Sequence, residues 1–351
     1  MSLFSKNSFG LDISDTSLKL IWLDEQGHIR AWNEMILGPG LMEKGVIKNK
    51  EKVAGAIKKL VATAKGKKIR TKKVVACLPE TKTFIKVIEI PAMMEEKKIG
   101  NFILDGIGRH FPLKAEEVYV DWQPLEDDKT EEDLLKVIVG VAPREIVDEY
   151  LEIIANAGLQ TEALQIEAGA IANALIAEKK SAKKEGEAPR MILDLGANRS
   201  SLILYDKGAI QFSISIPVSG SGITEEIAAA LKISLAEAEN EKIKSGLENQ
   251  KSKGYKVIEK NFSIIAMEIK QATKFEGRRD GEEVGELILC GGVAETKKLP
   301  EYLAAKTKLN VVFGNPFSNI KPEKRQHLKL PGSPISFSTA IGLALAGIES
   351  N

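Results

Sequence analysis

Apolar side chains in the first half of the chain recur with the periods of both β-strands and α-helices. Between Phe9 and Leu23, apolar positions flank the short polar run Ser14–Ser17, which predicts two strands joined by a tight turn. Proline or glycine closes several later apolar segments, for example at Pro79 and Gly158. We expect further strands at 74–78, 84–90 and 134–141, and helices at 53–64, 95–111, 146–157 and 163–177.

A charged stretch, Glu178–Arg190, interrupts this pattern with lysines, glutamates, a glycine and a proline. Such a composition is typical of an exposed loop, so we expect a boundary between two halves of the protein here. After the loop the apolar pattern begins again. We expect strands at 191–195, 200–205, 210–217, 286–290 and 311–313, and helices at 224–231, 234–245, 257–275, 298–307 and 338–346.

Two segments, one in each half, resemble one another. Asp12 and Asp24 lie twelve residues apart, as do Asp194 and Asp206. In both segments the first aspartate ends an apolar run, a turn of small residues follows, and the second aspartate ends another apolar run. A glycine comes soon after each segment, so the pair indicates a duplicated strand-turn-strand unit.

These two units have the composition of a phosphate-binding site. Small residues allow a tight turn to aim several backbone N–H groups at one anion. Asp12 and Asp194 would repel phosphate, but they could hold a hydrated Mg²⁺ that neutralises it. Either segment alone could equally be an ordinary hairpin with a polar turn. Two strand-turn-strand units that face each other could contact a triphosphate from both sides.

A third motif is the apolar strand at 287–290 followed by Gly291 and Gly292. Glycines at this point let a flat ring or a ribose lie against bare backbone. Alone, a glycine pair indicates only a strand-to-helix turn that needs positive φ. Together with the two earlier units, it predicts a nucleotide site.

The composition, charge balance and cysteine content of the chain indicate a globular, intracellular protein. The 351 residues are 43% hydrophobic and 28% charged, which is typical of two globular domains. Fifty basic residues balance 49 acidic ones, so we do not expect nucleic acid as a partner. No window approaches the ~20 apolar residues of a membrane span, so we do not expect direct membrane insertion. Two separated cysteines, Cys77 and Cys290, predict buried reduced thiols, and three histidines make a zinc site improbable. Residues 1–8 lack the apolar run of a signal peptide, so we expect a cytoplasmic protein.

With these motifs in place, the sequence resembles the superfamily of actin, Hsp70 and the sugar kinases. Segments 10–19, 194–201 and 287–294 look like its first phosphate, second phosphate and adenosine motifs. Within the superfamily the chain is most similar to the PilM family of type IV pilus assembly. The segments that carry this closer similarity are 85–91, 110–113, 117–121, 153–158, 164–168 and 338–346.

The resemblance implies an α/β fold of two ribonuclease H-like (actin-like) domains, the first with a small inserted subdomain as in FtsA. The first domain would comprise 1–177, with the insertion at about 92–143, and 320–351 would return to it. The second would comprise 190–319, with a smaller helical subdomain at about 223–283.

The resemblance also implies ATP and Mg²⁺ as cofactors and assigns a role to each site residue. Asp12 and Asp194 would hold Mg²⁺ through water, and Glu167 would lie near the attacking water. Contacts with the nucleotide would come from Ser14, Thr16, Ser17, Lys19, Gly196, Ala197, Asn198, Glu268, Gln271, Gly291 and Gly292. The chain departs from the family pattern at Ser14, where glycine is usual, at Arg199, where a small hydroxyl residue is usual, and at Gln271, where a basic residue is common.

By the same resemblance, the protein would lie beneath the inner membrane and bind the N-terminal cytoplasmic peptide of PilN. Nucleotide state would be coupled to the assembly platform, with at most slow ATP hydrolysis. Two alternatives remain open at this point. One is a small-metabolite kinase, for which Glu167 is the candidate base. The other is a filament-forming protein like FtsA or MreB.

Overall fold

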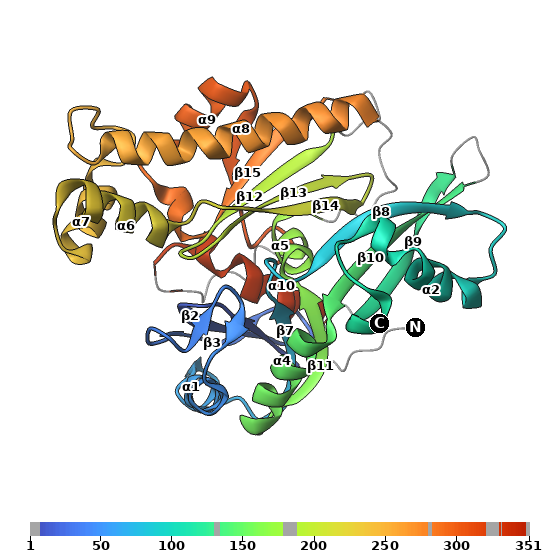
Figure 1. Cartoon of the computed structure of the whole chain (residues 1–351). Helices are drawn as coiled ribbons and strands as arrows, with labels where there is room; N and C mark the ends of the chain where they lie inside the picture. Colours follow the sequence, from blue (N-terminus) through green and yellow to red (C-terminus); the bar gives the residue numbers. More distant parts are fainter. Residues whose placement is uncertain are drawn as a thin grey trace.

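The computed structural model describes residues 8–129, 134–177, 188–279, 283–320, 330 and 332–348. Two mixed β-sheets form the frame of the molecule, and helices cover their outer faces (Figure 1). Helices α5 (Glu167–Leu175) and α10 (Ser338–Ala346) lie between the two sheets. Among the described residues, no helix combines the length and apolar character needed to cross a membrane.

The first sheet has six strands in the order β11-β7-β1-β2-β3-β6. Strands β1, β2 and β3 form an antiparallel meander, while β7 lies parallel to β1 and β11 lies parallel to β7. A separate two-stranded ribbon pairs β4 (Met42–Glu43) with β5 (Val46–Ile47). The strands of the sheet are β1 (Phe9–Ile13), β2 (Ser17–Leu23), β3 (Ile29–Ile36), β6 (Lys65–Gly66), β7 (Lys73–Leu78) and β11 (Gln160–Ile166).

The second sheet has eight strands in the order β16-β15-β12-β13-β14-β8-β10-β9. Strands β12, β13 and β14 form an antiparallel meander, and β15 and β16 follow in parallel on the other side of β12. The strands are β8 (Phe84–Pro91), β9 (Val118–Lys129), β10 (Leu134–Pro143), β12 (Arg190–Leu195), β13 (Ser200–Asp206), β14 (Ala209–Ile216), β15 (Glu286–Cys290) and β16 (Asn310–Phe313).

The two sheets therefore contain the same five-strand arrangement, β11-β7-β1-β2-β3 in one and β16-β15-β12-β13-β14 in the other. The hairpins also share their register, because Asp12 pairs with Lys19 and Asp194 pairs with Ser201. Each aspartate is thus paired with the residue seven positions after it. This identity of order, direction and register confirms the duplicated ribonuclease H-like architecture expected from the sequence.

Helices bury the apolar outer face of each sheet. The first core joins β1, β2 and β7 to α1 (Lys50–Ala62) and α4 (Arg144–Asn156). Both helices are amphipathic, with apolar residues such as Ile57 and Ile153 fully buried. The second core joins β12, β13 and β15 to the remaining covering helices. These are α6 (Gly220–Leu231), α7 (Leu235–Ser245), α8 (Tyr255–Arg279) and α9 (Leu299–Thr307).

A third core lies between the sheets and is built mainly from α5 and α10. Helix α10 is apolar on all sides, as expected for a helix enclosed by other elements. It approaches β1 at Gly10 and α5 at Gly342 so closely that neither position has room for a Cβ atom. These glycines therefore set how near the central helices lie to each other and to the first sheet.

The predicted insertion at 92–143 carries α2 (Glu96–Asp105), α3 (Ile107–His110), β9 and β10. Together with β8, these elements enclose a fourth apolar core. Strand β8 meets β14 through the pair Lys86 and Phe212, so the inserted strands extend the second sheet (Figure 1).

Most predicted elements are present, with shifts of a few residues at their ends. The helix expected at 163–177 is wrong in its first four residues, which belong to β11, because they pair in parallel with β7. Strands β3, β4, β5, β6 and β9 are additional to the expected ones, and the single helix expected at 95–111 is divided into α2 and α3. Of the loop expected at 178–190, residues 178–187 lie outside the described part of the chain. A short 3-10 turn, Gly292–Glu295, follows the glycine pair.

Candidate functional site

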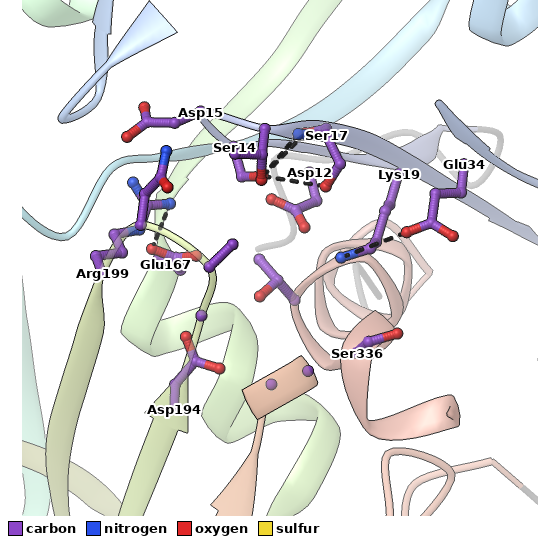
Figure 2. Close-up of a pocket in the computed structure, with 17 residues that line it drawn as sticks. Asp12, Ser14, Asp15, Ser17, Lys19, Glu34, Glu167, Asp194, Arg199 and Ser336 are labelled. Carbon is purple, nitrogen blue, oxygen red and sulfur yellow. Dashed lines mark hydrogen bonds and ion pairs between the residues drawn. The ribbon is translucent and has the colours of Figure 1, made fainter. Parts of the chain in front are cut away.

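A cavity of about 240 Å³ lies where the two hairpins approach each other, with the start of α5 and the segment before α10 as its other walls (Figure 2). All the predicted site residues except Glu268 and Gln271 line it. Its lining consists of Asp12, Ser14, Asp15, Thr16, Ser17, Lys19, Glu34, Glu167, Asp194, Gly196, Ala197, Asn198, Arg199, Gly291, Gly292, Ser336 and Thr339.

The turn of the first hairpin is closed by its own hydrogen bonds. The backbone N–H and the hydroxyl of Ser14 both donate to the carbonyl oxygen of Ser17, each at 3.0 Å. The carboxylate of Asp15 accepts a hydrogen bond from the Gly45 N–H at 2.8 Å, which ties the turn to the ribbon β4–β5. The side chain of Ser14 thus helps to close the turn.

Lys19 projects from β2 into the same cavity and carries one of its two cationic groups. Its ammonium group lies 3.9 Å from Glu34 and 5.7 Å from the ring centre of Phe337. At 3.9 Å in a partly exposed position, the pairing with Glu34 is weak. Lys19 can therefore turn towards an anion in the cavity at little cost.

The turn of the second hairpin rests on the start of α6. The N–H of Gly196 donates to the Arg199 carbonyl at 2.9 Å, and the N–H of Gly220 donates in turn to Gly196 at 3.1 Å. The N–H of Ser221 donates to the Ala197 carbonyl at 2.7 Å, and its hydroxyl donates to the Asn198 side chain at 2.8 Å. Because a helix start holds it at several points, this turn is preformed.

The two aspartates occupy equivalent environments. The thiol of Cys77 on β7 donates to Asp12 at 3.5 Å, and the thiol of Cys290 on β15 donates to Asp194 at 3.5 Å. Both cysteines are free and buried, as the sequence predicts. Burial raises the pKa of Asp12, and it raises the pKa of Asp194 to about 7. The nearby carboxylate of Glu167 raises both values further, so these carboxylates favour a bound cation.

Glu167 is the first residue of α5 and is paired with Arg199. One guanidinium nitrogen of Arg199 lies 2.9 Å from Glu167 Oε2, with 10% and 7% of the two side chains exposed (Figure 2). This attraction raises the pKa of Arg199 above its already high ordinary value despite burial. A second acid, Glu80, accepts a hydrogen bond from the Ala168 N–H at 3.3 Å. Burial raises the pKa of Glu80 to about 7.

Gly291 and Gly292 play different parts at the end of β15. Gly291 has φ of 81°, and a Cβ there would lie 2.7 Å from Asp194 Oδ1 and overlap the Leu195 carbonyl oxygen. Its N–H donates to the Ile335 carbonyl at 3.3 Å. Gly292 has open space beside it, since no atom would come within 4 Å of its Cβ. Gly291 is therefore required by the fold, and Gly292 leaves a bare stretch of backbone on the cavity wall.

The donor set fits a hydrated divalent cation with a polyphosphate. Within the described ranges, no group of three or more histidine, cysteine, aspartate or glutamate side chains could enclose a metal directly. Asp12 and Asp194 instead present single carboxylates to a shared cavity, which suits Mg²⁺ because it keeps several of its waters. Lys19 and Arg199 supply the positive charge that phosphate oxygens need.

Five lining residues were not among the predicted site residues: Asp15, Glu34, Arg199, Ser336 and Thr339. Asp15 and Arg199 lie inside the first and second phosphate motifs, so the motifs themselves could have indicated them. The other three come from elements that only the fold brings to the cavity. Conversely, Glu268 is half-buried and Gln271 is exposed on α8, outside the cavity lining. Their contact with ribose and base stays a prediction.

Comparison with known proteins agrees with the resemblance described above. A chain of the PilM-PilN type IV pilus biogenesis complex is 24% identical, with a TM-score of 0.80 over 98% of this chain and 99% of that one. The ethanolamine utilization protein EutJ from Carboxydothermus hydrogenoformans is 15% identical, with a TM-score of 0.57 over 97% and 89%. MreB 5 of Spiroplasma citri bound to AMPPNP is 14% identical, with a TM-score of 0.53 over 95% and 93%.

These neighbours share one architecture, and the duplicated sheets described above agree with it, so the fold is actin-like. The family model for "Type IV pilus assembly protein PilM" matches residues 10–348, which include both hairpins, the glycine pair and α10. Because this match spans nearly the whole sequence, the chain belongs to the PilM family of type IV pilus assembly proteins.

Proposed function

We propose that this chain binds Mg·ATP between its two sheets and acts in type IV pilus assembly as a nucleotide-binding scaffold. One observation carries the proposal: two hairpins of identical register, one from each sheet, present Asp12 and Asp194 to the same cavity. The structure of MreB 5 with AMPPNP, a protein of the same fold, is consistent with a nucleotide of this class. Family membership supports the role in pilus assembly.

In this proposal each wall of the cavity contacts a different part of the nucleotide. When bound, Mg²⁺ supplies the charge neutralisation that allows a triphosphate to lie between two carboxylates. Asp12 and Asp194 hold its water shell, and Lys19 contacts phosphate oxygens directly. The backbone of Gly292 receives the adenosine, because the space beside it is open.

We expect at most slow hydrolysis. Glu167 is the residue best placed to orient or deprotonate a water at the phosphates, but its carboxylate is 2.9 Å from Arg199. Because the guanidinium of Arg199 occupies this carboxylate, Glu167 must separate from Arg199 before it can contact a water at the phosphates. The same pairing argues against a metabolite kinase that uses Glu167 as its base.

Equilibrium dialysis with radiolabelled ATP and Mg²⁺ tests the nucleotide site. We expect the double variant Asp12→Ala, Asp194→Ala to bind ATP about 10–100-fold more weakly, the range for loss of a metal's outer partners. Asp105→Ala serves as the matched control, because Asp105 is exposed at the end of α2 and does not line the cavity. Equal ATP binding by the wild type and the double variant would contradict the site.

We further propose that the chain binds the N-terminal cytoplasmic peptide of a PilN-like inner-membrane protein and reaches the membrane through it. The similar structure of a PilM-PilN complex supports this partner. Met93 on the inserted segment is 92% exposed and offers an apolar contact for such a peptide. Family membership is consistent with a cytoplasmic location.

Fluorescence anisotropy of the labelled peptide tests this partner. We expect saturable binding by the wild type and none to a scrambled peptide. Met93→Ala should weaken binding. Ile243→Ala should leave it unchanged, because Ile243, 61% exposed, lies on α7, away from the inserted segment (Figure 1). Failure of the wild type to bind would remove this partner.

The domain division is part of the same proposal. We propose that 1–177 and 320–351 form the first domain, with 92–143 as its insertion, and that 190–319 forms the second. Nucleotide contacts both hairpins, so its binding would favour the closed arrangement of the two domains.

A further inference from the structure

Arg199 is the least expected group in the cavity. It lies in the turn between β12 and β13, and its side chain is nine-tenths buried. It adds positive charge to the cavity, but the proposed function assigns it no contact with a particular phosphate. A buried arginine must have a compensating partner, because removal of a guanidinium from water is costly.

That partner is Glu167, and the pairing is incomplete. The nitrogen Nη2 lies 2.9 Å from Glu167 Oε2, yet it makes no well-directed hydrogen bond to any described residue. The contact is therefore one of charge rather than of matched donor and acceptor directions. A guanidinium has five donors in a planar fork, so Arg199 retains unused capacity for an anion.

The pair also joins the two halves of the protein. Glu167 begins α5 directly after β11, in the first sheet, whereas Arg199 belongs to a hairpin of the second sheet. An anion that drew Arg199 away would break this link across the cavity. The ion pair is thus placed to respond to whatever occupies the cavity.

The position of Arg199 indicates which part of a nucleotide it would meet. In Figure 2, Arg199 and Glu167 lie on one side of the cavity and Ser336 lies on the opposite side. Gly291 lies between these two sides, because its N–H donates to the Ile335 carbonyl beside Ser336 and a Cβ on it would lie 2.7 Å from Asp194 Oδ1. With adenosine against Gly292, a phosphate chain that runs towards Arg199 would bring its terminal group closest to the guanidinium.

We propose that Arg199 binds the terminal phosphate of a nucleoside triphosphate and that it stays paired with Glu167 until this phosphate is bound. The inference rests on the proposed function, since it requires a nucleotide in the cavity. The terminal phosphate of a triphosphate replaces Glu167 as the partner of Arg199. The link between the halves then opens, and the Glu167 carboxylate is left unpaired. A diphosphate is too short to replace Glu167, and the ion pair stays closed.

Isothermal titration calorimetry with Mg·ATP and Mg·ADP tests the proposal on the whole chain. We expect the wild type to prefer ATP, and Arg199→Ser to reduce the ratio of ATP affinity to ADP affinity by about tenfold, as for loss of one charge-assisted hydrogen bond. Glu167→Gln should raise that ratio, because it removes the competing carboxylate while keeping the side-chain shape.

The two variants are expected to change the ratio in opposite directions, which a merely structural ion pair would not produce. An unchanged ratio in Arg199→Ser would overturn the role of Arg199. If Arg199→Ser does not fold, Glu167→Gln decides: an unchanged or reduced ratio overturns the proposal. Failure of the wild type to bind either nucleotide would instead reject the proposed function itself.

Discussion

Gly342 gives the sharpest prediction about what holds the two halves together. It lies within α10, where that helix crosses α5 between the sheets. A Cβ at this position would overlap the carbonyl oxygen of Ala170 and lie 2.6 Å from its carbonyl carbon and 3.1 Å from its Cα. All three atoms are backbone, so no rotation of a side chain can relieve the overlap. Gly342→Ala must push α10 away from α5.

Two opposing effects determine the size of the change. Replacement of glycine by alanine inside a helix stabilises it by about 1 kcal/mol. Overpacking a rigid core costs about 1–3 kcal/mol and more where backbone has to move. Since the obstacle here is backbone, we expect a net loss of about 2 kcal/mol or more. With an unfolding entropy of about 2.1 cal/mol/K per residue, a loss of about 2 kcal/mol in a chain of 351 residues lowers the melting temperature by about 3 °C.

Thermal unfolding of Gly342→Ala and Gly55→Ala side by side checks this reasoning. Gly55 lies exposed in α1 with no atom within 4 Å of a Cβ, so the same substitution should stabilise the protein by about 0.5–1 kcal/mol. Because α5 begins at Glu167, Gly342→Ala should also weaken ATP binding. A Gly342→Ala protein as stable as the wild type would refute the close crossing of α5 and α10.

Two further predictions concern Glu80, a buried acid behind Glu167, and Gly291 on the cavity wall. Burial raises the pKa of Glu80 from 4.5 to about 7, so between these pH values the folded state binds more protons than the unfolded state. Stability should therefore fall by up to about 3 kcal/mol as pH rises through this window, and urea unfolding of Glu80→Gln should show a smaller fall. Gly291→Ala should destabilise the protein by about 1–3 kcal/mol because of its φ of 81° and its contact with Asp194, whereas Gly38→Ala, in open space, should not. Equal unfolding midpoints for these two glycine variants would contradict the assigned backbone geometry.

The sequence predicts the duplicated hairpins because their signal is local. Asp12 and Asp194 each end an apolar strand and are followed by small turn residues, and the structure gives both hairpins the same register. Strand β3 escapes prediction because it carries polar residues on both faces, including the buried Asn33. Asn33 is satisfied by hydrogen bonds to the Leu60 carbonyl and to Thr63 on or beside α1, which no local pattern reveals.

The end of β11 shows the same limit at the site itself. Residues 163–166 read as the start of a helix together with the alanine-rich segment after them, but pairing with β7 makes them a strand. The helix therefore starts at Glu167, with this carboxylate in its first turn at the cavity. Helical propensity is a weak preference, and tertiary pairing overrides it here.

The pairing of Glu167 with Arg199 depends on the approach of two sheets, so no spacing along the chain could have predicted it. It also explains how one cavity can hold several acids. Asp12, Asp194 and Glu167 repel one another, and burial adds to the unfavourable free energy of their charged forms. Arg199 offsets part of this repulsion through its ion pair with Glu167. While it is paired in this way, Arg199 cannot bind another anion with the same nitrogen. A cation that entered with a polyphosphate would replace that compensation, so electrostatic strain between the buried carboxylates favours binding of the metal and the phosphates together.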